Sequence, residues 1–121
     1  MNFLFVALGG ALGASFRYAI SLIPVKSQFP ILTLVINLLG AILIGFVVGF
    51  AENRNLSENS ILFLKTGLCG GFTTFSTFSL ESYNLIDSKF YGLCSLYVFL
   101  SVVGCLLGVW FGKNLVSGSF N

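Results

Sequence analysis

The stretch 70–79, GGFTTFSTFS, holds the residue types in this sequence that are best suited to bind a small ion. Two adjacent glycines are costly inside a helix, and two adjacent threonines are stiff and divert backbone hydrogen bonds, so the stretch is easily broken. Phenylalanines recur at every third position from Phe72 to Phe78 and form one aromatic stripe in a helix. The hydroxyls of Ser76 and Thr77 lie beside that stripe. A breakable apolar stretch with aromatic edges and hydroxyls predicts a site inside a membrane protein.

The composition indicates that the whole chain belongs to a membrane. It has 121 residues, of which 56% are hydrophobic and 8% charged, and its mean hydropathy is +0.98. Soluble domains carry about 25% charged residues. The charged residues divide the chain into four apolar runs, each near the ~20 residues that span a bilayer as a helix. We expect one all-α transmembrane domain, 1–121, with no removable signal peptide and with spans of roughly 3–23, 31–50, 61–80 and 90–112.

The third run is expected to be a broken helix. Between Lys65 and Glu81 lie only 15 uncharged residues, which is short for a straight span. Non-helical backbone at mid-membrane is tolerated only where protein or a cavity surrounds it. Such a break exposes carbonyl oxygens and helix ends, which suit the coordination of a small cation or anion.

Polar side chains also occur in the other runs, and two of them, Asn37 and Arg17, allow two interpretations each. Asn37 follows Thr33 by four residues on one helical face, and it either bridges two helices or lines a polar pathway. Arg17, near the second end of its run, either extends to the headgroups or has a functional role, tethering a partner or attracting anions at a pore mouth. In run four, Tyr97, Ser101 and Cys105 recur every four residues and form a polar line.

Small residues recur at helix-packing distances. Gly9 and Gly13 stand four apart, as do Gly104, Gly108 and Gly112, and this spacing lets membrane helices approach closely. The three cysteines contain no Cys-x-x-Cys pair, so we interpret them as small packing residues and not as a disulfide framework or a zinc site.

The positive charges predict no preferred orientation. Four spans divide the basic residues three against three, so the positive-inside rule has almost nothing to act on. Two copies inserted in opposite orientations would pair around a two-fold axis in the membrane plane. The two groups are Arg54, Lys65 and Lys113 on one side, and Arg17, Lys26 and Lys89 on the other.

Three segments together resemble the Fluc (CrcB) family of fluoride channels over essentially the whole chain. They are GGALGASFRY at 9–18, TLVINLLGAILIGF at 33–46 and GLCGGFTTFSTFS at 67–79. The resemblance implies a multi-pass protein of the cell membrane, the inner membrane in a prokaryote, that exports fluoride passively and lowers its cytoplasmic concentration. It also implies an antiparallel, dual-topology homodimer with two pores, or a heterodimer of two opposed paralogous subunits.

The resemblance assigns roles to matching residues. Phe75 and Phe78 would present positive ring edges to fluoride, and Asn37 would offer its amide N–H. Backbone carbonyls of Gly70 and Thr73, one pair from each subunit, would hold a structural sodium ion at the dimer interface. The remaining assignments are hydroxyls along the fluoride pathway from Ser76, Thr77, Tyr97 and Ser101, and vestibule positions for Arg17 and Glu81.

One position departs from the family pattern, and other functions compete. Cys105 stands where some relatives continue the hydroxyl line, and a thiol is a weak donor. A small multidrug-type exporter would need a carboxylate within a span, whereas all four acidic residues lie at or beyond the ends of the runs. A membrane scaffold would explain the glycines but not Asn37 together with the 70–79 stretch. The chain has no histidine and no metal-ligand cluster, so we expect no enzyme activity, and we expect no nucleic-acid partner.

Overall fold

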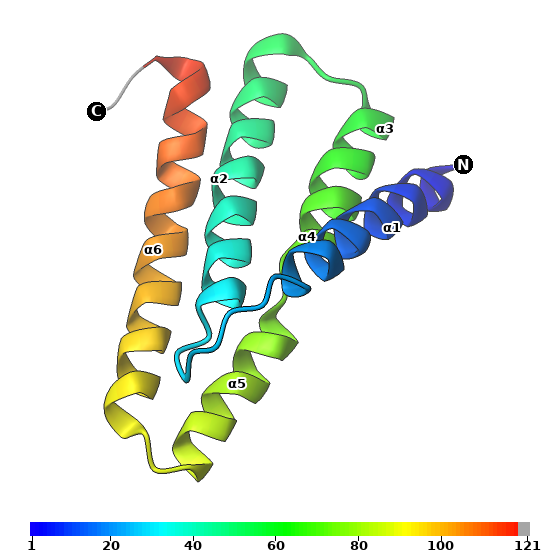
Figure 1. The fold of residues 1–121 in the computed structure, drawn as a ribbon. Coiled ribbons are helices and arrows are strands. Elements are labelled where there is room, and N and C mark those ends of the chain that lie inside the picture. Colours follow the sequence, from blue (N-terminus) through cyan, green and yellow to red (C-terminus); the bar gives the residue numbers. More distant parts are fainter. Residues whose placement is uncertain (119–121) are drawn as a thin grey trace.

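The computed structural model describes residues 1–118, and these residues form helices joined by short connections (Figure 1). No strand occurs among them. The helices are α1 (Asn2–Ser21), α2 (Ile31–Arg54), α3 (Glu58–Ile61), the π-helical η1 (Leu62–Cys69), α4 (Gly70–Phe72), α5 (Phe75–Asp87) and α6 (Tyr91–Ser117).

Three of these helices, α1, α2 and α6, are long and apolar enough to cross a membrane. The expected class is therefore confirmed in its coarse form, an all-helical, multi-pass membrane protein. The expected run 61–80 is divided: α3, η1 and α4 follow one another to Phe72, and α5 begins at Phe75. α2 continues past residue 50 to Arg54, and α5 continues past residue 80 to Asp87, which places Glu81 inside a helix.

The helix ends follow from local sequence. α2 ends where Asn55 adopts a left-handed backbone with φ 52°, a conformation that asparagine tolerates better than most residues. The Ser57 hydroxyl caps α3 by accepting the Ser60 N–H at 3.2 Å. α6 ends at Gly118, whose φ of 67° suits a glycine.

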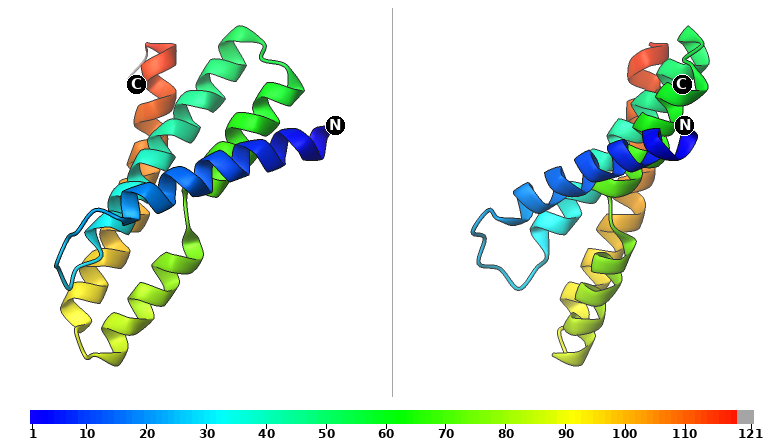
Figure 2. Two further views of the ribbon diagram at one scale, coloured as in Figure 1. Left: turned by 45° about the vertical axis from the view of Figure 1, so that its right-hand side comes forward. Right: turned by 90° about the vertical axis from the view of Figure 1, so that its right-hand side faces the viewer.

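Two pairs of helical segments build the fold. α2 and α6 run side by side, and α1 crosses η1 and α4 obliquely (Figures 1 and 2). Glycines make both contacts close. A Cβ on Gly112 would overlap the carbonyl oxygen of Ile42, and one on Gly13 would overlap the carbonyl oxygen of Leu68. Backbone-to-backbone packing of this kind replaces the hydrophobic effect, which does not drive helix association in lipid.

The buried core lies where α2, α5 and α6 meet. Tyr97 is completely buried there, and Phe29 and Phe78 pack against this cluster, whose buried members are Leu34, Leu85, Cys94 and Tyr97. Large apolar side chains elsewhere are exposed, as Phe3 (89%) and Leu106 (68%) illustrate. This inverted distribution is the one expected of a chain surrounded by lipid.

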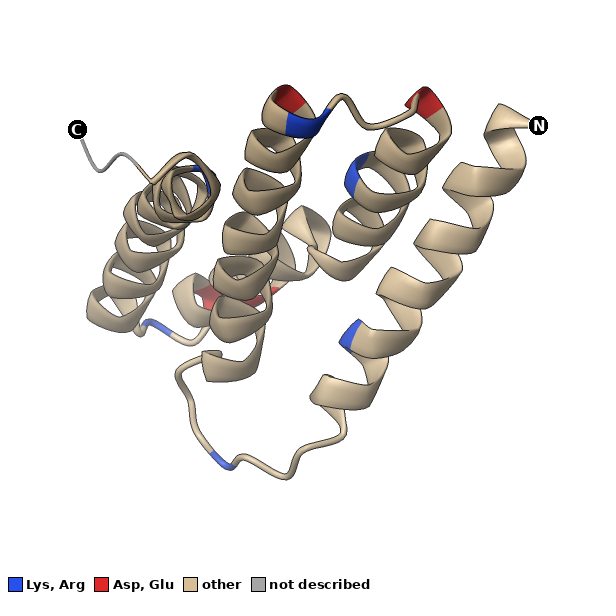
Figure 3. Cartoon of the chain, turned by 90° about the horizontal axis from the view of Figure 1, so that it is seen from above, with Lys and Arg blue, Asp and Glu red and all other residues tan. Residues whose placement is uncertain are grey.

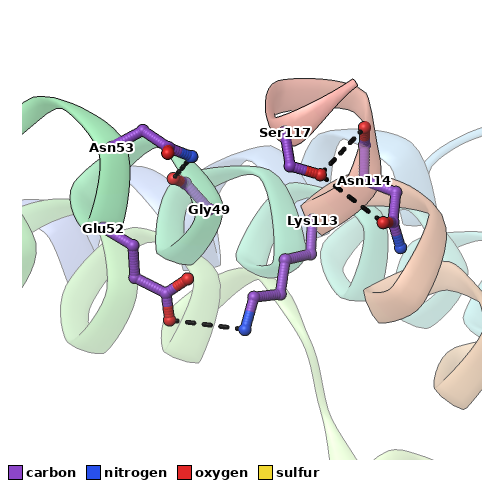
Figure 4. A network of polar contacts seen from close by, with 6 residues as sticks. All are labelled: Gly49, Glu52, Asn53, Lys113, Asn114 and Ser117. Carbon is purple, nitrogen blue, oxygen red and sulfur yellow. Dashed lines mark hydrogen bonds and ion pairs between the residues drawn. The ribbon is translucent and has the colours of Figure 1, made fainter. Parts of the chain in front are cut away.

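Charged residues are few and lie mostly near helix ends, with long uncharged stretches between them (Figure 3). At the ends of α2 and α6 the Lys113 ammonium lies 3.3 Å from the Glu52 carboxylate, beside a hydrogen bond from the Asn53 amide to the Gly49 carbonyl (Figure 4). Both charged side chains are about half exposed, so this pair stabilises the fold by about 1 kcal/mol at most. Lys65 lies within η1, about two turns after Glu58, which begins α3.

Candidate ion pathway

The helical backbone is interrupted at Thr73 and Thr74. Both residues are extended, with φ and ψ of −82° and 157° for Thr73 and −147° and 113° for Thr74. The Thr73 N–H and hydroxyl both donate to the Cys69 carbonyl, at 3.0 and 2.9 Å, which closes the helix before the interruption. The Thr74 hydroxyl oxygen accepts the Thr77 N–H at 3.1 Å and caps α5. The Thr74 hydroxyl thus takes the place of the Thr73 carbonyl as acceptor for the Thr77 N–H. The Thr73 hydroxyl adds a second bond to a carbonyl that already has its helical donor.

Asn37 of α2 secures the interruption from across the chain. Its amide nitrogen donates to the Thr74 carbonyl at 3.2 Å, and its amide oxygen accepts the Thr74 N–H at 2.9 Å. The side chain therefore pairs with one residue's main chain in both directions, as a neighbouring strand would. Inside a membrane these two backbone groups have no water to bond, so Asn37 satisfies them. The helix-bridging role considered from the sequence is present, and Asn37 also lines the groove described below.

Arg17 holds α1 to the segment before the interruption. Its Nε donates to the Gly71 carbonyl at 3.1 Å, and its side chain is partly buried. That carbonyl lies at the C-terminal end of a helical segment, where carbonyls lack helical partners and the helix dipole favours a cation. Arg17 thus has a defined contact with the protein through its Nε.

Gly40 lets the interruption lie directly against α2. A Cβ at this position would overlap the Thr73 side-chain methyl and come within 3.4 Å of the Phe72 ring. The close approach brings the Thr74 main chain within reach of Asn37, one turn earlier on α2.

An open groove of about 520 Å³ runs beside the interruption, between α2, η1, α5 and α6. Its walls are mostly apolar. It brings together six of the residues singled out from the sequence, namely Asn37, Gly70, Thr73, Phe75, Phe78 and Ser101. Cys105 and Lys65 line it as well.

The aromatic residues of the groove form a short row. Phe75 is 79% exposed, and its ring lies 5.6 Å from that of Phe78, tilted by 46°. The Phe78 ring lies 5.1 Å from that of Tyr97. The row leads from the open groove at Phe75 to the buried core at Tyr97.

Two buried hydroxyls lie on α6 near this row. Neither the Tyr97 hydroxyl nor the Ser101 hydroxyl makes a well-formed hydrogen bond within residues 1–118. On α2, the Thr33 hydroxyl donates to the Glu81 carboxylate at 2.5 Å. Unpartnered buried hydroxyls are costly in an apolar interior, so their presence calls for an explanation.

The other predicted pathway residues lie differently. Ser76 is exposed and Thr77 half-buried, and neither lines the groove. Both contact the Thr74 hydroxyl, at 3.3 Å for Ser76 and 3.0 Å for Thr77. Sequence reasoning assigned no role to Thr33, although its four-residue spacing from Asn37 placed it on the same face of the helix.

The interruption leaves two carbonyls without their helical donors. In a continuous α-helix the Thr74 N–H would bond the Gly70 carbonyl, but here it donates to Asn37. The Thr77 N–H would bond the Thr73 carbonyl, but it donates to the Thr74 hydroxyl. Residues 1–118 hold no group of three or more histidine, cysteine, aspartate or glutamate side chains arranged for a metal. The oxygens of Gly70 and Thr73 are thus a donor set that suits a hard cation.

Helices long and apolar enough to cross a membrane, packed around a groove and an interrupted helical segment, define a multi-pass membrane protein. Residues 4–113 match the family model described as CrcB-like protein, Camphor Resistance (CrcB). The chain belongs to this family.

Relatives from distant prokaryotes match along nearly their full length. The chain is 44% identical over 111 residues to a protein of Methanococcus maripaludis named fluoride-specific ion channel FluC, covering 91% of each chain. Proteins of the same name from Methanocaldococcus jannaschii and Bacteroides fragilis are each 41% identical over 118 residues. The coverage is 97% of this chain and 95% of the relative for the first, and 93% of each chain for the second.

Proposed function

We propose that this chain forms a passive, fluoride-selective channel that lowers cytoplasmic fluoride, and that it is not an enzyme. The observation that carries the proposal is the 44% identity, over 91% of both chains, to a relative named fluoride-specific ion channel. The groove beside Thr73 and Thr74 supports it, because that groove gathers aromatic edges, an amide and a hydroxyl on one path.

The groove chemistry suits a small, strongly hydrated anion. A selective pore must replace the water around fluoride without holding the ion too tightly to leave. Phe75 and Phe78 offer the positive edges of their rings to the ion. Such contacts are weak, so the ion can leave them again. Asn37 uses one amide hydrogen for Thr74 and keeps a second for the groove. The unpartnered Ser101 hydroxyl supplies a further donor.

We propose that α3, η1 and α4 together with α5 make one broken transmembrane crossing, which gives four crossings per chain. The connection 55–57 and the C-terminal end of α6 lie toward one end of the bundle, and the connections 22–30 and 88–90 lie toward the other (Figures 1 and 2).

We also propose that two copies assemble antiparallel, each supplying one of two pores. The three-against-three division of basic residues supports insertion in both orientations. The 79% exposure of Phe75 supports a partner, because a large aromatic ring at the site of a selective pore needs walls on its open side. A paralogous subunit could supply the same surface in a heterodimer.

The two carbonyls at the interruption would hold the structural sodium ion. Gly70 and Thr73 oxygens from each of two antiparallel copies give four ligands around the two-fold axis, all oxygen. A sodium ion there would offset the negative ends of four carbonyl dipoles in an apolar setting. Replacing sodium with N-methylglucamine is expected to lower the thermal stability of the purified dimer, and unchanged stability would contradict the site.

Fluoride efflux from liposomes tests the function. The purified chain is reconstituted alone, and efflux is followed with a fluoride electrode beside a chloride electrode. Fast fluoride efflux without chloride efflux supports a selective channel and a self-sufficient homodimer. If folded protein gives no fluoride efflux, even after co-reconstitution with a related subunit, the proposed channel function is contradicted. Efflux that requires a proton gradient would favour the exporter alternative.

A further inference from the structure

We propose that Lys65 is an electrostatic guide that draws anions into the groove. The inference rests on the proposed function and deepens it. Lys65 lines the groove, and it is the only charged residue among the residues that do. Within residues 1–118 its ammonium group makes no ion pair or hydrogen bond. A cation in a membrane segment is costly and is normally paired, so an unpaired one at the wall of a groove calls for a functional role.

Lys65 lines the groove from η1, in the helical segment formed by α3, η1 and α4. It lies about two turns, roughly 10 Å, after Glu58, which begins α3. It stands four residues before Cys69 and eight before Thr73, and all three line the groove, so they share one face of the segment. The side chain therefore lies between the outer end of the segment and the interruption, along the path an ion would take to Phe75.

The helix around Lys65 is itself unusual. η1 is π-helical, and the Gly70 N–H donates to the Lys65 carbonyl, five residues back. A π-helical turn contains an extra residue and shifts the faces of the residues before it, and such turns are frequent at functional sites. In this chain Lys65 and Thr66 both belong to η1 and both line the groove.

The physical effect is long-range attraction. Apolar walls focus the field of a single charge into the space between them, which raises the local concentration of the opposite ion. No carboxylate lines the groove to cancel the field. Thr73 lies eight residues from Lys65, about 12 Å along the helix, where a unit charge at an effective dielectric constant of about 20 to 40 changes ion occupancy by about three- to tenfold.

Lipid phosphates offer the competing explanation. A lysine near a membrane surface can extend its ammonium group to the headgroups, and it then serves only to anchor the helix. The two roles respond differently to salt in the aqueous phase. Attraction of an ion is screened when the Debye length falls from about 20 Å at about 20 mM salt to about 4 Å at about 500 mM salt. A headgroup anchor would instead depend on the charge of the lipid.

The test compares Lys65→Gln with Lys65→Arg and with the matched control Lys113→Gln. The control removes the same charge from a side chain that pairs with Glu52 and lies outside the groove. Initial fluoride efflux is measured at low, sub-saturating fluoride in zwitterionic liposomes, in about 20 mM and about 500 mM potassium gluconate at constant sodium. A second series replaces part of the lipid with phosphatidylglycerol.

At low salt, Lys65→Gln is expected to slow efflux by about three- to tenfold, and at high salt by less than about twofold. Lys65→Arg, which keeps the charge, and Lys113→Gln are expected to stay within about twofold of the unsubstituted chain at both salt concentrations. Three results would contradict the guiding role of Lys65. They are an equal loss of efflux rate at both salt concentrations, a loss seen only with anionic lipid, and a loss no larger than that of Lys113→Gln. If the unsubstituted chain itself gives no fluoride efflux, the channel function is contradicted instead.

Discussion

The side-chain amide of Asn37 and the main chain of Thr74 form two hydrogen bonds, one in each direction, at 3.2 and 2.9 Å. This pair joins α2 to the extended backbone between α4 and α5. It also diverts the Thr74 N–H from the Gly70 carbonyl. A single side chain thus shapes the interruption, the candidate cation ligands and the wall of the groove.

Replacing Asn37 tests this dependence. Asn37→Ala leaves the Thr74 N–H and carbonyl without partners, so we expect the free energy of unfolding to fall by about 2–5 kcal/mol. Asn37→Asp still accepts the N–H but cannot donate, so an intermediate loss is expected. Unfolding in mixed detergent measures both. The control is Asn53→Ala, which removes an amide hydrogen bond within α2, to Gly49, and should cost about 1 kcal/mol or less. Equal losses at positions 37 and 53 would contradict the role of Asn37.

The contact of α1 with the segment before the interruption gives a second prediction. A Cβ on Gly13 would overlap the Leu68 carbonyl and lie 2.7 Å from the Phe72 nitrogen, both of which are backbone atoms that cannot yield cheaply. Gly13→Ala should therefore lower the free energy of unfolding by about 1–3 kcal/mol. Gly92→Ala is the matched control, because nothing lies within 4 Å of its added Cβ. We expect that control to be neutral or stabilising by up to about 1 kcal/mol. Identical effects at the two positions would argue against close packing.

The hydrogen bond between Thr33 and Glu81 gives a third prediction. The Thr33 hydroxyl donates to this partly buried carboxylate at 2.5 Å, so Thr33→Val removes a charge-assisted hydrogen bond while keeping the side-chain shape. A double-mutant cycle with Glu81→Gln is expected to give a coupling energy of about 1–3 kcal/mol. The matched cycle, Lys113→Gln with Glu52→Gln, involves a half-exposed pair and should give less than about 1 kcal/mol. A coupling at Thr33 no larger than this would rule out a specific bond.

The class of the fold could be predicted from composition because four apolar runs leave no room for a soluble domain. The point of interruption was harder to place. The glycines at 70 and 71 are helical in the structure, while the extended residues are Thr73 and Thr74. Gly71 serves helix packing instead, because a Cβ there would overlap the Gly10 carbonyl of α1. The Thr74 hydroxyl replaces a lost helical acceptor there, and the Thr73 hydroxyl adds a bond to the Cys69 carbonyl.

Long-range relationships were beyond the sequence. Nothing local indicates that Asn37 meets Thr74 or that Arg17 meets Gly71, because each contact depends on how α1 and α2 pack. The polar line of run four also divides in space. Tyr97 lies in the core, whereas Ser101, one turn later, reaches the groove.

The central claim is that the groove beside the interruption is the fluoride path. It is tested most directly by the initial fluoride efflux of Phe75→Ile and Phe78→Ile in liposomes, with Phe99→Ile as control. Ile keeps an apolar side chain but has no positive ring edge, and Phe99 is 61% exposed on α6 outside the groove.

We predict that each groove variant slows efflux by at least about tenfold, which corresponds to about 1.4 kcal/mol, while Phe99→Ile conducts like the unsubstituted chain. Folding of each variant is checked by its elution as a single species. Groove variants that fold and conduct fluoride at the unsubstituted rate would contradict the claim and place the path elsewhere.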